Sequence, residues 1–80
     1  MLFRSRANSL SRAAIAQRES ELALAQKEYA RGQALVAKDF ISREQFDQEL
    51  SQSKSAAAAL AQEQARLQAA EAALAAELAR

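Results

Sequence analysis

The 80-residue sequence contains no cysteine, no histidine and no proline, and it has one glycine and few aromatic residues, namely three Phe and one Tyr. Without cysteine there is neither a disulfide framework nor a thiol nucleophile, and without histidine the commonest general base and metal ligand is missing. No glycine-rich phosphate-binding loop is present. The carboxylates, such as Glu19 and Glu44, are expected on exposed helix surfaces, far from any dry pocket. We therefore expect no enzyme activity, no cofactor and no metal site.

An excess of charge of one sign is also missing. Eleven Lys and Arg face ten Asp and Glu, which gives a formal net charge of +1 with both signs interspersed. The basic residues form no stripe and alternate with no aromatic residues, so nucleic-acid binding is not expected. The longest apolar run, residues 56–61, is far too short to span a bilayer.

The sequence is rich in alanine, with 22 residues, while its large apolar side chains are few and evenly spaced. This profile is typical of long helices that pack along a narrow seam. In the first half, apolar residues recur every seven positions. In the second half the seam follows a 4-3-4-3 spacing, with Gln64 and Glu71 as polar intrusions; its positions are 46, 50, 53, 57, 60, 64, 67, 71, 74 and 78. Such a seam buries little surface, so we expect the chain to oligomerise or to be part of something larger. The first-half seam residues are Ile15, Leu22, Tyr29 and Val36.

A helix start lies in the middle of this pattern. Ser42 is followed three residues later by Gln45, which is the spacing of a capping box, and Ile41 and Phe46 have the spacing of a hydrophobic staple. The sequence therefore predicts an all-α fold, an antiparallel two-helix coiled-coil hairpin over residues 9–80, with a helix at 9–37, a turn at 38–41 and a helix at 42–79. Residues 1–8 are expected to be irregular, with an artificial start. Antiparallel pairing places Phe46 beside Val36, and Tyr29 near Leu50 and Ser53.

Three residues across the predicted turn carry a family resemblance: Arg31, Leu35 four positions later, and Ser42 seven after that. With the alanine-rich heptads on both sides, residues 12–80 resemble the hairpin of the periplasmic adaptor proteins, also called membrane fusion proteins (the HlyD and AcrA-like family). Asp39 departs from the family pattern, because many members have a glycine there that can take positive φ. Asp tolerates that conformation better than most residues.

The resemblance implies a hairpin from a periplasmic adaptor of a tripartite efflux pump or type I secretion system. Such an adaptor lies in the periplasm and is attached to the inner membrane through parts absent from this chain. Its hairpin tip docks onto a TolC-like outer-membrane channel, neighbouring adaptor subunits form a ring, and other domains contact an inner-membrane transporter. The expected tip contacts are Arg31, donating to carbonyls or carboxylates, Leu35, inserting into an apolar groove, and Ser42, hydrogen-bonding across the contact.

Each tip residue also has a purely structural interpretation. Arg31 can pair with Glu28 on a solvated helix face, Leu35 can belong to the seam, and Ser42 can act only as a helix cap. The alternative function is accordingly a structural coiled coil with no specific tip contact. That alternative predicts tolerance to substitution at Arg31 and Leu35, and sensitivity at seam residues such as Leu22.

Overall fold

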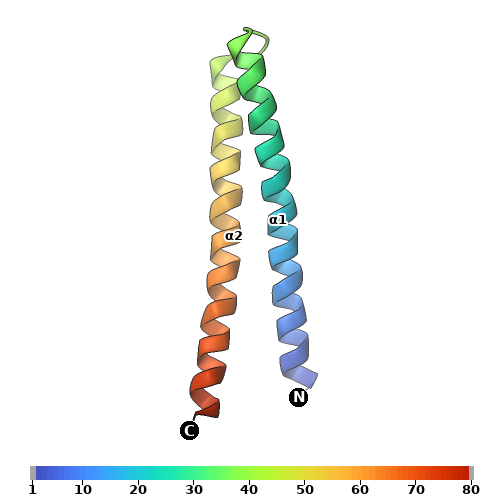
Figure 1. The fold of residues 1–80 in the computed structure, drawn as a ribbon, viewed down its shortest axis with the longest axis vertical. Helices are drawn as coiled ribbons and strands as arrows, with labels where there is room; N and C mark the ends of the chain where they lie inside the picture. The colour runs from blue at the N-terminus through green and yellow to red at the C-terminus, as the bar shows by residue number, and fades with distance from the viewer. Residues whose placement is uncertain (1, 80) are drawn as a thin grey trace.

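The computed structural model describes the backbone of residues 2–79 and the side chains of residues 9–79. Two α-helices of 36 residues each, α1 (Leu2–Ala37) and α2 (Arg43–Leu78), fold back on each other in a hairpin of 61 × 19 × 13 Å (Figure 1). The prediction of an all-α, antiparallel two-helix hairpin is confirmed. Neither helix contains a segment with the length and apolarity needed to cross a membrane, as far as the described residues extend.

The first helix begins earlier than the sequence predicts. α1 starts at Leu2 instead of residue 9, so the expectation of irregular structure is wrong for residues 2–8, whereas Met1 lies outside the described residues. Asn8 and Ser9 are common caps, but inside a helix each costs only tenths of a kcal/mol relative to alanine, and no glycine or proline interrupts the segment. Cap-forming residues alone therefore do not stop the helix. The end of α1 at Ala37 is as predicted.

The turn after α1 has the hydrogen bonds of a Schellman motif. The backbone N–H of Phe40 donates to the Leu35 carbonyl at 2.9 Å, and that of Asp39 donates to the Val36 carbonyl at 3.1 Å. Asp39 has φ 59°, the left-handed conformation that was expected for this position. The chain thus leaves α1 through a defined turn that caps the last carbonyls of the helix.

The start of α2 is fixed by Ser42. This residue is extended (φ −74°, ψ 156°), and its hydroxyl oxygen accepts a hydrogen bond from the backbone N–H of Gln45 at 3.0 Å. The predicted N-cap is confirmed, and α2 begins at the next residue and ends at Leu78, one position before the predicted end. The return hydrogen bond of a full capping box, from the Gln45 side chain to the Ser42 N–H, does not occur among the described contacts.

The seam of α1 follows the predicted heptad, whose four members are all half-buried. Gly32, three residues after Tyr29, is buried. Tyr29 stacks on Phe46, with ring centroids 5.3 Å apart and an interplanar angle of 21°. The sequence analysis had placed Tyr29 near Leu50 and Ser53, so this aromatic pair was not anticipated. It holds the two helices together on the turn side of the hairpin.

The seam of α2 departs from the predicted spacing at four of its ten positions. Residues 57, 64, 71 and 78 were expected in the seam but are exposed, and Leu78 is 70% exposed. Leu50 and Leu74 are half-buried as predicted, as are Phe46, Ser53, Leu60 and Leu67. Glu49, Ala56, Ala59 and Glu63 are half-buried as well, although they were not predicted in the seam. Gly32 provides the room for Glu49, whose carboxylate lies directly over it.

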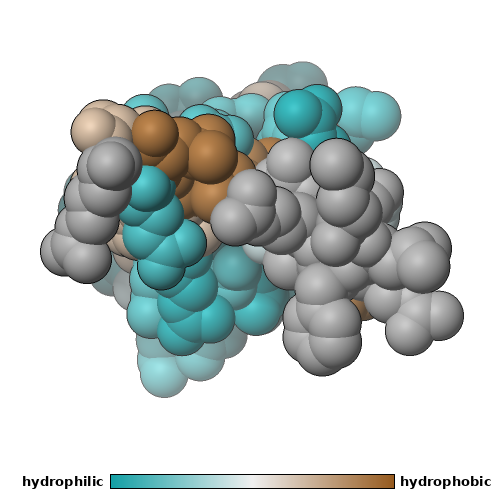
Figure 2. Space-filling model, turned by 90° about the horizontal axis from the view of Figure 1, so that it is seen from below, coloured by the Kyte–Doolittle hydropathy of each residue, from teal (hydrophilic) through white to brown (hydrophobic). Residues whose placement is uncertain are grey.

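Burial is uneven along the hairpin. In Figure 1 the helices are close at the turn and diverge toward the two termini. Figure 2, which views the opposite end from the turn, shows apolar surface exposed there beside hydrophilic side chains. Leu10 in α1 is 71% exposed, and no described side chain is buried as a hydrophobic core residue. The fold is therefore a thin seam, and its turn is fixed by the Schellman hydrogen bonds and the Ser42 cap.

Candidate interaction surface at the hairpin tip

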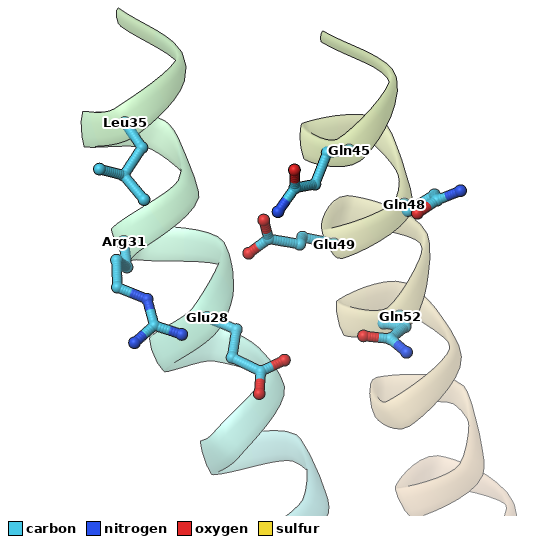
Figure 3. A pocket seen from close by; sticks show the side chains of 7 residues that line it. All are labelled: Glu28, Arg31, Leu35, Gln45, Gln48, Glu49 and Gln52. Carbon is cyan, nitrogen blue, oxygen red and sulfur yellow. The ribbon is translucent and has the colours of Figure 1, made fainter. Parts of the chain in front are cut away.

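A groove of about 590 Å³ lies between the two helices, next to the turn (Figure 3). Two of the three predicted tip residues, Arg31 and Leu35, line it from the α1 side. The opposite wall is polar and comes from α2. We call this surface the tip groove, and its lining residues are Glu28, Arg31, Leu35, Gln45, Gln48, Glu49 and Gln52.

Arg31 projects from the last third of α1 and is exposed. The ion pairs between described side chains are Arg18–Glu21 at 3.0 Å and Arg66–Glu63 at 3.7 Å, so Arg31 makes none with them. The structural interpretation, a pair with Glu28, is therefore not realised, although both residues line the tip groove. A guanidinium that has five N–H donors and no carboxylate partner among the described side chains is available to bind acceptors on another molecule.

Leu35 combines the two roles that the sequence left open. Its side chain is half-buried and also lines the tip groove. Its carbonyl oxygen accepts from the backbone N–H groups of both Lys38, at 3.2 Å, and Phe40, at 2.9 Å. The backbone of Leu35 is thus held by the turn, which presents its side chain as an apolar part of the groove wall.

Ser42 does not line the tip groove. It is exposed, and its hydroxyl oxygen is engaged by the Gln45 N–H as the cap of α2. A serine hydroxyl that accepts one hydrogen bond can still donate another. The cap role of Ser42 is thus observed, and its contact with a partner stays a prediction.

The polar wall of the groove and the exposed aromatic residue Phe40 were not predicted from the sequence. Gln45, Gln48 and Gln52 recur at spacings of three and four, which places them on one face of α2. This spacing was a usable signal. Phe40, in the turn, is 71% exposed. No residue pattern distinguishes an exposed apolar side chain at this position from a buried one.

These features define an antiparallel coiled-coil hairpin with a capped turn and an outward-facing groove beside it. The family model described as the RND MFP alpha-helical hairpin domain matches residues 7–77, almost the whole chain. The chain belongs to this family, the helical hairpins of the membrane fusion proteins. No curated protein and no solved structure matches the sequence at a significant level.

The family has a general role, location and set of partners. Membrane fusion proteins are non-enzymatic adaptors, and the family is in general periplasmic and anchored to the inner membrane. In RND pumps their hairpin domains generally contact outer-membrane channels and other adaptor subunits. The resemblance inferred from the sequence is therefore confirmed at the level of the membrane fusion protein hairpin.

Proposed function

We propose that this hairpin is the docking element of a periplasmic adaptor in a tripartite efflux pump or type I secretion system. Its tip binds a TolC-like outer-membrane channel, and the chain catalyses nothing. Neighbouring hairpins contact one another along their lengths, and domains outside this chain engage the inner-membrane transporter and hold the adaptor at the inner membrane. Family membership supports the adaptor role, and the tip groove supports the docking role.

The observation that carries the proposal is the position of Arg31 in the tip groove without an ion-pair partner among the described side chains. The last carbonyls of a partner's helix are unsatisfied within that helix and carry a partial negative charge. The planar fork of Arg31 can donate two hydrogen bonds to such carbonyls or to a carboxylate beside them. The tip of a helical channel offers these acceptors.

The remaining groove residues suit the same partner. Leu35 provides apolar surface beside the Arg31 charge, and the side-chain amides of Gln45 and Gln48 can donate to and accept from backbone groups. Ser42, outside the groove but at the same end, has a hydroxyl proton with which to donate across the contact. An interface with an arginine, an apolar neighbour and a polar rim has the usual composition of a protein–protein hot spot.

The experiment measures binding of the 80-residue chain to a TolC-like channel in lipid nanodiscs by biolayer interferometry. Arg31→Asp and Leu35→Ser are compared with matched changes on α1 outside the groove. Lys27→Asp makes the same charge change at an exposed site one turn away, and Leu24→Ser removes a leucine that is 58% exposed. Each tip variant is expected to weaken binding by about tenfold or more, because hot-spot truncation costs about 2 kcal/mol. The two controls should bind like the parent chain.

Circular dichroism of the same variants separates docking from folding. Helicity should be unchanged in both tip variants, since Arg31 is exposed and Leu35 is only half-buried. Normal binding by Arg31→Asp and Leu35→Ser would contradict the proposal and favour a structural coiled coil. The structural coiled coil also predicts that Leu22→Ser, in the seam, lowers helicity, whereas substitutions at the tip have no specific effect on binding.

A further inference from the structure

Phe40 is an aromatic side chain that the fold does not use. It is 71% exposed, whereas Tyr29 and Phe46 are half-buried and stacked on each other in the seam. It also lies in the turn itself, between the end of α1 at Ala37 and the cap of α2 at Ser42. A molecule that approaches the hairpin end-on therefore meets Phe40.

The backbone holds Phe40 in a fixed place. Its N–H donates to the Leu35 carbonyl at 2.9 Å, and the residue before it, Asp39, has φ 59°. A loop tip without such bonds would lose much conformational entropy on binding. Here the motif has already ordered the backbone, so a partner has only the ring to immobilise, and an aromatic ring with two rotatable bonds loses little entropy.

Phe40 lies close to the tip groove in the chain, although it does not line it. The hydrogen bond joins it to Leu35, which lines the groove, and Arg31 lies one helical turn further along α1. Aromatic and arginine residues are the types most enriched at binding hot spots, and charged rims around an apolar centre are their usual arrangement. The end of the hairpin thus presents an exposed aromatic ring beside a polar groove that contains Arg31.

We propose that Phe40 is the apolar anchor of the docking contact, and that its ring inserts into an apolar notch between helix ends of the outer-membrane channel. This inference rests on the proposed function and adds the residue that supplies the end-on contact. The molecule that binds Phe40 is the channel, because a side chain at the extreme end of the hairpin faces a partner located beyond that end. A neighbouring hairpin that packs along the length of the helices, as proposed above, would not contact the turn.

The test uses Phe40→Ala and Phe40→Leu in the same nanodisc binding assay. The matched control is Leu10→Ala, because Leu10 has the same exposed fraction, 71%, and lies thirty residues along α1, roughly 45 Å from Phe40 at 1.5 Å per residue. Phe40→Ala is expected to raise the Kd by about 30-fold, the fold-change at which a residue counts as a hot spot. Phe40→Leu should recover most of the affinity, and Leu10→Ala should leave it unchanged.

Three outcomes overturn the inference in distinguishable ways. If Phe40→Ala binds normally while Arg31→Asp does not, Phe40 is no anchor and the proposed docking function stands. If neither variant affects binding, the docking function fails as well. If Phe40→Ala reduces self-association of the hairpin in sedimentation velocity but not channel binding, the occupant is a second copy of the chain. Since Phe40 is exposed, circular dichroism should show that all the variants fold.

Discussion

Gly32 is buried in the seam, and replacing it with alanine tests how closely the helices pack there. A Cβ at this position would lie 3.0 Å from Oε2, 3.1 Å from Oε1 and 3.2 Å from Cδ of Glu49. These three nearest atoms belong to the carboxyl end of one flexible side chain, and none belongs to the backbone of α2. The added methyl group therefore requires Glu49 to move by a few tenths of an ångström, while the helices can stay where they are.

Two opposing terms set the size of the effect. Glycine to alanine inside a helix gains about 1 kcal/mol in helix propensity. Turning a side chain away from its preferred rotamer costs about 0.5–1.5 kcal/mol, and the small shift required of Glu49 falls at the low end. Gly32→Ala should therefore raise the free energy of unfolding by about 0.5 kcal/mol. In a Glu49→Ala background, where the contacting carboxylate is gone, the gain should approach the full value of about 1 kcal/mol.

Urea unfolding followed by circular dichroism at 222 nm measures both values, and the double-mutant cycle gives the coupling between Gly32 and Glu49. A coupling of about 0.5 kcal/mol is expected from the same two terms. If Gly32→Ala destabilises the hairpin in both backgrounds, the glycine is required by the approach of the α2 backbone, and the reasoning from the carboxylate is refuted.

Two further stability predictions concern the turn and use the same unfolding assay. Ser42→Ala should lower the free energy of unfolding by about 1 kcal/mol because the Gln45 N–H loses its acceptor. Ser42→Asp should keep the free energy of unfolding of the parent chain, because aspartate can also cap a helix. Equal stability of the parent chain, Ser42→Ala and Ser42→Asp would show that the cap contributes nothing. Asp39→Gly should stabilise by about 0.5 kcal/mol, since relief of the left-handed strain exceeds the entropy cost of glycine. Asp39→Val should destabilise, and a loss of stability in Asp39→Gly would contradict the strain argument.

The parts of the fold that local rules determine were predictable. The seam of α1 follows from a seven-residue repeat of large apolar side chains, and the turn follows from a serine cap next to a residue that tolerates positive φ. The start of α1 was not predictable from capping residues, because their preference for helix ends is weak compared with the helix propensity of a segment free of glycine and proline. Residues 2–8 are helical for this reason.

The seam of α2 shows a different limit. Phe46, Ser53, Leu60 and Leu67 belong to the seam in both the predicted and the observed spacing. These four residues therefore do not distinguish one spacing from the other. The two spacings differ in the residues between. The predicted one has Leu50, Ala57, Gln64, Glu71 and Leu78, of which only Leu50 is half-buried, whereas the structure also half-buries Glu49, Ala56 and Glu63. Contact between the two helices determines which spacing is adopted, because Glu49 occupies the space that Gly32 leaves open on the facing helix. A single sequence does not reveal such a pairing.

The candidate site was predicted in part. Arg31 and Leu35 lie together in the tip groove because they are four residues apart on one helix face, which sequence spacing does reveal. The glutamine wall comes from the other helix, so its proximity depends on the antiparallel register. Phe40 required the structure, because its position after Asp39 in a Schellman motif is one where apolar residues often pack back onto the helix. Here the ring is exposed instead.

The capped turn also explains how a hairpin this thin can present a docking surface at its end. A helix end normally has unpaired carbonyls or N–H groups, and burying them against a partner costs free energy unless the partner pairs with them. At this tip the Leu35 and Val36 carbonyls are already bonded within the turn, and the Gln45 N–H is bonded to Ser42. A partner can therefore cover this end without supplying replacements for these bonds. The affinity then depends on the side chains that project from the turn and groove, which is where the substitutions proposed above should act.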